Sequence, residues 1–439
     1  MNILGLQFGH DAGIAALSDG LPMVNMIRER HNRAKHAFGI SVSHIEQALA
    51  DAKLTVENID MVAITSGQVY ELVVVDQPDQ LKIEYQPHPD VEIASSLYDV
   101  LIQDGISVED RLVGQILNRR IYSQVYQDPV NVQYYHNMFP ERRYVKKEDL
   151  GITGFLSGYI TSPIWEKEMG LGDIANLDIK PILNDERFRT GLHYPITVVL
   201  KNRRIPAVIV QHHAAHAAST FYTSQSERAA IFTHDGAFFQ VGPNNGMIFY
   251  GDQNRLIPII PNHLSIGDLY DKVGAALGFD LFGAAGKLMG LAPYGKPRFF
   301  HRKMVGNTYD LRRNGIAEPD KTWLAHCCEM ARSFGYDLSP LGNVDRILEP
   351  VCVDIAASTQ KLFEETILAA VEAVSGMFSL AGMPMDTLCF SGGTALNCPT
   401  NSRLFAESPF QTIHITPHCD DSGLSLGAAQ YLYHFILNL

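Results

Sequence analysis

The chain has few cysteines, few basic residues and no long apolar segment. Six cysteines occur among 439 residues, none in a C-x-x-C pair, and a chain this long does not need disulfides, so we interpret them as reduced core residues. The 35 lysines and arginines against 48 acidic residues, a net charge of −13, argue against a nucleic-acid-binding surface. No run reaches 18 apolar residues and no signal peptide is recognisable, so we expect a cytoplasmic protein without a membrane span.

The length of the chain predicts two or three domains or lobes. Strands, glycine-bearing turns and helices alternate in 1–67 and 206–439, which indicates an α/β fold with two similar lobes. The segment 68–205 is rich in charged and aromatic residues, and we interpret it as an inserted cap of mixed structure. The patterns predict strands at 3–8, 22–27, 61–65, 207–210, 229–233, 387–390 and 412–415, helices at 43–52, 212–222, 266–278, 354–380 (N-cap Asp354, stop Gly382) and 424–437, and a loop at 286–295.

A run of histidines is the clearest chemical signal. His212 and His216 stand four residues apart, so on a helix they share one face and can bind one metal ion. Asp235 and Asp421 each follow an apolar strand, and a glycine comes one or two residues after each. Carboxylates at strand ends that face a cleft commonly hold a metal–phosphate complex. Two imidazoles and two carboxylates suit iron, manganese or zinc. Asp420 is the competing carboxylate, and a buried helix with incidental histidines is the alternative for the pair.

Glycine-bearing turns indicate a nucleotide site. Gly392 and Gly393 follow a buried strand and open a helix, so their amides can approach a nucleotide whose phosphates the helix N-terminus favours. A close helix–strand packing turn is the alternative. The turn 9–13 has the same form, and His10 on it is a candidate general base, or else a turn cap. Lys287 is a candidate to offset phosphate charge, with a solvated loop lysine as the alternative.

Six ordered motifs over 1–65 and 205–435 resemble the O-carbamoyltransferase family, which includes the nodulation-factor, tobramycin and cephamycin carbamoyltransferases. The motifs are Gly9-His10-Asp11-Ala12, Glu29-Arg30 with Lys35-His36, His212-His213-x-x-His216-Ala217-Ala218-Ser219, Gly286-Lys287-x-Met289-Gly290-Leu291-Ala292-Pro293-Tyr294-Gly295, Ser391-Gly392-Gly393-x-Ala395-Leu396-Asn397 and Asp421-x-Gly423-Leu424-x-Leu426-Gly427-Ala428-Ala429. The resemblance implies a two-lobed actin-like/sugar-kinase ATPase-type fold, similar to that of the transferase that puts threonylcarbamoyl on tRNA. Gly267-x-x-x-Asp271-Lys272 is similar to the nucleotide-side motif of that transferase.

The resemblance also implies a reaction. A carbamoyl group would pass from carbamoyl-adenylate, made from ATP and carbamoyl phosphate, to a hydroxyl of a sugar or natural product. It implies that the four metal-ligand candidates hold a divalent metal, iron in this family, against the phosphate of the adenylate. The other implied roles are catalysis by His10 and Lys287, nucleotide binding by Gly267, Asp271, Gly286, Gly392, Gly393 and Asn397, and substrate binding by Asp11 and Lys35.

The chain departs from the family in one large feature. Family members usually carry a second domain that makes carbamoyl-adenylate, and this chain stops at Leu439 without it. We therefore expect carbamoyl-adenylate from elsewhere, for example from a separate adenylate-forming protein. The segment 68–205 has no matched counterpart and would set the choice of acceptor.

Three other functions stay open on the sequence alone. The first is a threonylcarbamoyl-type transferase acting on tRNA, which tRNA binding at low salt would reveal. The second is a nucleotide-binding regulatory protein that has lost its chemistry. The third is a plain sugar kinase, which has no need of a His-x-x-x-His metal site.

Overall fold

Two mixed β-sheets organise the chain. The computed structural model describes residues 1–37, 39–65, 71–72, 80–84, 86–94, 155–156, 171–236, 245–262, 264–280, 283–305 and 319–439. The first sheet has the strand order β3 (Leu21–Ile27), β2 (Gly13–Ser18), β1 (Asn2–Gln7), β4 (Met61–Thr65), β9 (Arg203–Val210), β8 (His193–Leu200) and β6 (Leu81–Glu84). The second has the order β12 (Arg255–Asn262), β11 (Gly246–Asp252), β10 (Arg228–His234), β13 (Thr387–Ser391) and β14 (Thr412–His414), and a separate short pair is formed by β5 (Glu71–Leu72) and β7 (Phe155–Leu156).

The two sheets repeat one arrangement of five strands. In the first, β1 pairs antiparallel with β2 and parallel with β4, and in the second β10 pairs antiparallel with β11 and parallel with β13. The next neighbours repeat too, because β3 and β12 pair antiparallel while β9 and β14 pair parallel. The orders β3-β2-β1-β4-β9 and β12-β11-β10-β13-β14 are therefore equivalent. This confirms the predicted α/β fold with two similar lobes.

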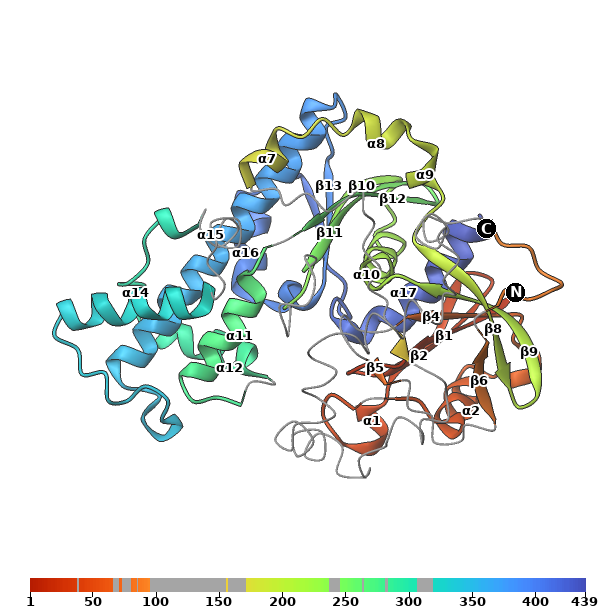
Figure 1. Cartoon of the computed structure of the whole chain (residues 1–439), viewed down its shortest axis with the longest axis horizontal. Coiled ribbons are helices and arrows are strands. Elements are labelled where there is room, and N and C mark those ends of the chain that lie inside the picture. The colour runs from red at the N-terminus through yellow and green to blue at the C-terminus, as the bar shows by residue number, and fades with distance from the viewer. Residues whose placement is uncertain are drawn as a thin grey trace.

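Helices cover both sheets (Figure 1). They are α1 (Glu29–Asn32), α2 (Val42–Asp51), α7 (Leu171–Ala175), α8 (Lys180–Asn184), α9 (Glu186–Arg189), α10 (His212–Phe221), α11 (Ile266–Ala276), α12 (Ala284–Leu291), α14 (Pro319–Ser333), α15 (Pro350–Leu380), α16 (Cys398–Glu407) and α17 (Leu424–Gln430). Short 3-10 turns are η1 (Val56–Asn58), η4 (Ala292–Tyr294), η5 (Val344–Arg346), η6 (Gly393–Leu396) and η7 (Asp421–Gly423), and α17 continues into a π-helical segment, η8 (Tyr431–Ile436). Within the described ranges, none of the helices combines the length and apolar character that crossing a bilayer requires.

Helices α10 and α17 lie between the two sheets and join the lobes (Figure 1). α17 packs on β1, β2 and β4 of the first sheet, whereas α10 packs on β10 and β13 of the second, and the two helices pack on each other. A Cβ atom at Gly5 would lie 2.0 Å from the carbonyl oxygen of Ser425, and one at Gly427 would lie 2.0 Å from that of Ala215. Both contacts bring backbone against backbone, so only glycine fits at these two positions.

Strand β1 is buried on both faces. Leu4 and Leu6 pack in a core shared with α2, while Ile3 faces the opposite core. That second core continues through the alanines of α10 and α17 into the strands of the second sheet. The lobes are therefore joined by one continuous apolar core, which holds the turns at the strand ends in place.

Two local predictions were wrong. Helix α15 begins at Pro350, with Glu349 as its N-cap, because Pro at the first helical position is favourable. Asp354 lies inside the helix, where its carboxylate accepts hydrogen bonds from Lys296 N and Tyr336 Oη instead of capping the helix end. Part of the segment predicted as a loop, 286–295, is helical in α12, which packs on α11 and α15. Packing on these neighbours outweighs the low helix propensity of the two glycines in α12.

Much of the described part of the predicted insertion, 68–205, belongs to the two lobes, whereas β5 and β7 form a pair of their own. Strands β6, β8 and the start of β9 pair in the first sheet. Helix α7 packs on α15, and α8 and α9 pack on β12, so this stretch crosses the second lobe before it returns to the first (Figure 1). Most of 73–170 lies outside the described residues, so the inserted cap stays a prediction.

Candidate metal centre and its surroundings

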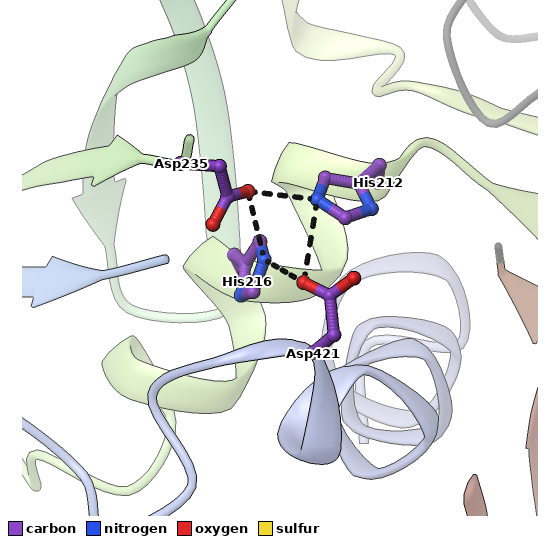
Figure 2. A group of neighbouring side chains, drawn as sticks. All are labelled: His212, His216, Asp235 and Asp421. Carbon is purple, nitrogen blue, oxygen red and sulfur yellow. Dashed lines mark hydrogen bonds and ion pairs between the residues drawn. The ribbon is translucent and has the colours of Figure 1, made fainter. Parts of the chain in front are cut away.

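Helix α10 begins directly after β9 and carries the two histidines. The Gln211 side chain caps the helix by accepting a hydrogen bond from Ala214 N at 2.8 Å. Every residue of α10 is buried. The small side chains of the helix allow close packing on both sides, and the imidazoles of His212 and His216 project from one face (Figure 2).

The two carboxylates reach this face from other elements. Asp235 follows β10, the central strand of the second sheet, and Asp421 begins η7, just before α17. His212 Nε2 lies 2.9 Å from Asp235 Oδ2 and 3.8 Å from Asp421 Oδ1. His216 Nε2 lies 3.2 Å and 3.3 Å from the same two oxygens, as Figure 2 shows. The structure therefore brings together all four side chains that the sequence singled out as metal ligands, and Asp420 is not among them.

The donor set fits one divalent ion. The four ligand atoms lie within 4.8 Å of one another, and all four residues are buried. Neighbouring ligands of a tetrahedral ion with bonds of about 2.1 Å stand about 3.4 Å apart, close to the separations found here. Two imidazole nitrogens and two carboxylate oxygens suit iron, manganese or zinc, with no preference among them from geometry alone.

The charged side chains in this group shift one another's pKa values. Burial alone would lower the pKa of His216, but the Asp235 and Asp421 carboxylates raise it to about 10. Burial alone would raise the pKa of Asp235, but His216 and His212 hold it well below its usual range. Without a cation, the proton held by His216 offsets charge on the buried carboxylates, and a metal ion would take its place.

Residues after β13 orient the group. The Ser391 hydroxyl donates to the carbonyl of Cys419 at 3.0 Å, so its oxygen can accept a hydrogen bond from His216 Nδ1, 3.4 Å away. That contact leaves His216 Nε2 facing the carboxylates. The backbone amide of Gly393 donates to Asp235 Oδ1. Gly392 has φ of +98°, and a Cβ there would lie 2.2 Å from the carbonyl oxygen of His234, so this turn requires glycine.

A second group of side chains adjoins the first. His10, on the turn after β1, lies with Nε2 3.1 Å from Asp421 Oδ2 and Nδ1 2.9 Å from Asp11 Oδ2. His36 Nδ1 is 3.1 Å from Asp11 Oδ1. The side chain of Gln7 holds the turn by donating to the carbonyl oxygen of His10 at 2.9 Å. The turns after β1 and β10, equivalent strands of the two lobes, thus both contribute to one site.

Comparison with known proteins identifies the family. The family model described as "Carbamoyltransferase N-terminus" matches residues 2–430. The chain belongs to this carbamoyltransferase family. The family resemblance found in the motifs is thereby confirmed.

Individual relatives match over part of the chain. An uncharacterized protein of Synechocystis sp., sll1178, is 32% identical over 239 residues, which are 52% of this chain and 37% of that protein. The nodulation protein NolNO of Sinorhizobium fredii is 30% identical over 226 residues, which are 50% of this chain and 30% of NolNO. The matches thus span about a third of the length of these relatives.

Similarity to solved structures is weak. The ROK hexokinase of Thermus thermophilus aligns over 98% of this chain and 97% of its own, with 10% identity and a TM-score of 0.32. HypF of T. kodakarensis aligns over 53% of this chain and 38% of its own, with 13% identity and a TM-score of 0.34. The strand order described above therefore carries the argument for the fold in this carbamoyltransferase-family chain.

Two of the predicted nucleotide-binding residues lie beside the metal group. A Cβ at Gly267 would lie 2.7 Å from the carbonyl oxygen of Asp235, so α11 approaches the strand end closely here. Asp271, one turn further along α11, places Oδ2 2.9 Å from where a Cβ of Gly236 would lie. Burial and the neighbouring Asp268 raise the pKa of Asp271 to about 7. Their role in nucleotide binding stays a prediction.

Other predicted site residues lie apart from the metal group. The side chain of Asn397 caps α16 and exchanges hydrogen bonds of 2.9 and 3.0 Å with Gln360. Gly286 and Lys287 are exposed on α12, with Lys287 Nζ 5.7 Å from the centre of the Phe279 ring. Lys35 is exposed on the segment that carries His36. The nucleotide, catalytic and substrate roles predicted for these four residues stay predictions.

Sequence reasoning assigned no role to His36, Ser391 or Gln7. His36 and Ser391 belong to the family motifs, but nothing in their spacing predicts which side chain they contact. His36 meets Asp11 across 25 positions, and Ser391 meets His216 across 175. Only the folded chain brings these partners together.

Proposed function

We propose that this chain is the transferase part of an O-carbamoyltransferase, which moves a carbamoyl group from carbamoyl-adenylate to a hydroxyl of a sugar or natural product. Membership of the carbamoyltransferase family supports the reaction class. The observation that carries the proposal is the 3.1 Å contact between His10 Nε2 and Asp421 Oδ2. This contact places a basic side chain directly beside the four-ligand metal group. Carbamoyl-adenylate would come from ATP and carbamoyl phosphate.

The residues divide the chemistry between them. His212, His216, Asp235 and Asp421 would hold the metal, iron being the one that the family resemblance implies. When bound, the metal would supply positive charge that stabilises the phosphate of the leaving AMP. His10 would take the proton of the acceptor hydroxyl. The hydroxyl oxygen then bonds to the carbamoyl carbon, the bond from that carbon to the phosphate oxygen breaks, and AMP leaves.

The glycines after the strands support a nucleotide beside the metal. The Gly393 amide lies next to Asp235, and Gly267 lets α11 approach the same strand end. Gly236 and Gly267 meet in this place, and side chains there would fill it. An adenylate would thus lie between α11 and the turn after β13, with its phosphate toward the metal group.

The test supplies the donor directly. Purified chain loaded with Fe²⁺ is mixed with synthetic carbamoyl-adenylate and a panel of sugars, and AMP and carbamoylated sugar are followed by chromatography and mass spectrometry. We expect metal-dependent AMP release matched by carbamoyl ester, and its loss in His216→Ala. His301→Ala, which removes an exposed histidine, is the matched control and should keep activity.

Two outcomes would contradict the proposal. Undiminished transfer in His216→Ala would show that the metal group takes no part in the reaction. ADP and a sugar phosphate formed from ATP and sugar, without carbamoyl transfer, would show a kinase instead.

A further inference from the structure

We propose that His10, Asp11 and His36 bind a second divalent cation beside the first metal group. Their ligand atoms are two imidazole nitrogens and a carboxylate oxygen, all within 4.8 Å of one another. His10 Nδ1 is 2.9 Å from Asp11 Oδ2, and His36 Nδ1 is 3.1 and 3.3 Å from the two oxygens of Asp11. Ligands at right angles around an ion with bonds of about 2.1 Å stand about 3.0 Å apart, so these separations suit one ion.

The ring of His10 has the surroundings of a metal ligand. Its Nδ1 faces Asp11 and its Nε2 faces Asp421, so both contacts are hydrogen bonds only when both nitrogens carry hydrogen. A cation at Nδ1 takes the place of one of these hydrogens. Histidines that ligate metals almost always donate their other N–H to a carboxylate, and Asp421 Oδ2 is positioned to accept from Nε2.

This group is open where the first is closed. The side chains of His10 and His36 are 40% and 36% exposed, and that of Asp11 is 13% exposed, so water or a substrate oxygen can complete the shell. Two histidines and one carboxylate with open positions form a ligand set typical of first-row divalent ions. The four ligands of the first group are all buried.

The backbone holds these ligands in place before any ion arrives. Asp11 and His36 both have positive φ, of 58° and 54°, which non-glycine residues seldom adopt. His36 N donates to Glu29 Oε2 at 3.2 Å, and the turn of His10 is fixed by Gln7. His10 and His36 both direct a ring nitrogen at the Asp11 carboxylate.

The purpose of this cation rests on the proposed function, whereas its binding does not. An acceptor hydroxyl bound at the open positions would lose its proton more readily, as water does on a metal. The cation would lower the pKa of the bound hydroxyl and His10 would act as its ligand instead of as a base, so the proton would pass to solvent water at the exposed side of the group. Asp421 would link the two centres, with one oxygen toward each.

The experiment measures how many Mn²⁺ ions each chain binds. The chain 1–439, freed of metal with a chelator, is titrated with Mn²⁺ by calorimetry, and the loaded protein is studied by electron paramagnetic resonance. We expect two Mn²⁺ per chain with a spin-coupled spectrum. His36→Gly should bind one, uncoupled, and His212→Ala/His216→Ala should also keep one.

Arg33→Gly is the matched control. Arg33 lies on the same segment, is exposed and has φ of 60°, so its change to glycine frees the backbone equally without removing a ligand. It should still bind two ions. Asp11→Asn, which tolerates the same φ, should lose the same ion as His36→Gly and guards against a folding defect.

The proposal is overturned if the unmodified chain binds one Mn²⁺, or if His36→Gly and Arg33→Gly bind equal numbers. Failure of carbamoyl transfer would leave these counts unchanged, so the two proposals are tested separately.

Discussion

Ser391 decides which nitrogen of His216 faces the carboxylates. Its hydroxyl hydrogen goes to the carbonyl of Cys419, so the imidazole must donate to the hydroxyl oxygen through Nδ1. The lone pair of Nε2 is then directed at the metal position. Partners of this kind orient metal-binding histidines and raise their affinity.

Ser391→Ala should therefore weaken metal binding without abolishing it. We expect an affinity for Zn²⁺ about 10-fold lower, because the ring loses its orientation while all four ligands remain. Competition with a chromophoric chelator would measure it. Thr394→Ala, which removes a hydroxyl bonded to the His234 carbonyl, is the control, and equal affinities in both variants would refute the role of Ser391.

Asp271 should make stability depend on pH. Its pKa is raised to about 7 in the folded chain by burial and by Asp268, against 3.8 when unfolded. The folded state thus keeps a proton that the unfolded state releases, so the free energy of unfolding falls as pH rises from 3.8 to 7. Asp271→Asn should remove this loss and be more stable than the unmodified chain by about 4 kcal/mol at pH 8, because each pKa unit corresponds to about 1.4 kcal/mol.

Urea unfolding at pH 4 and pH 8 would measure this difference. At pH 4 the difference should be below about 1 kcal/mol, because the carboxyl is protonated in the folded state and only about half ionised in the unfolded state. A stability difference that is the same at both pH values would show that Asp271 does not titrate between them.

At the scale of elements, the packing of α17 depends on two glycines, which have no side chain at the points of contact. Gly427 faces the backbone of α10, and Gly5 of β1 faces the backbone of α17. The helix that follows Asp421 is thus set between a strand of one lobe and a helix on the other. A shift of α17 would move Asp421 away from His216.

Gly427→Ala should destabilise the fold, because its Cβ would lie 2.0 Å from the carbonyl oxygen of Ala215. Overpacking of this kind costs about 1–3 kcal/mol. Gly290→Ala in α12 is the matched control, since a Cβ there meets nothing within 4 Å, and it should stabilise the helix by about 0.5–1 kcal/mol.

Thermal unfolding of both variants would test this contrast. Equal melting temperatures would mean that α10 and α17 can separate without cost. The metal content of Gly427→Ala should also fall, because Asp421 lies six residues before the substituted position.

At the scale of the whole molecule, the metal group joins parts that are far apart in the chain. Its ligands come from α10, from the end of β10 in the second sheet, and from η7 before α17, which packs on the first sheet. An ion bound there would tie the two lobes together. The apolar core already joins them, so the ion adds to a contact that exists without it.

Metal binding should therefore raise the melting temperature. An ion at 100 times its dissociation constant stabilises the folded state by about 2.7 kcal/mol. Calorimetric scans with Zn²⁺ and with a chelator would measure the shift, and His212→Ala/His216→Ala should show almost none. A shift of equal size in that variant would place the stabilising ion elsewhere.

Sequence alone determined the local features of this protein. Strand and helix periods predicted the central strands of both sheets and the helices α2, α10, α11, α15 and α17, but not β11, β12 or α14. The spacing of His212 and His216 put two imidazoles on one face of a helix. Motifs identified the carbamoyltransferase family, because glycines and metal ligands at fixed spacing are properties of short segments. The sequence did not predict the extent of α12 or the start of α15, because packing on neighbouring helices determines both.

Only the tertiary structure decided which distant residues meet. Asp421 rather than Asp420 joins Asp235, because η7 and α17 are fixed by glycine contacts with α10 and β1. His36 reaches Asp11, and His10 links that pair to Asp421, through turns from three parts of the chain. These contacts depend on how two sheets pack around two helices, a property of the whole core that no segment carries by itself.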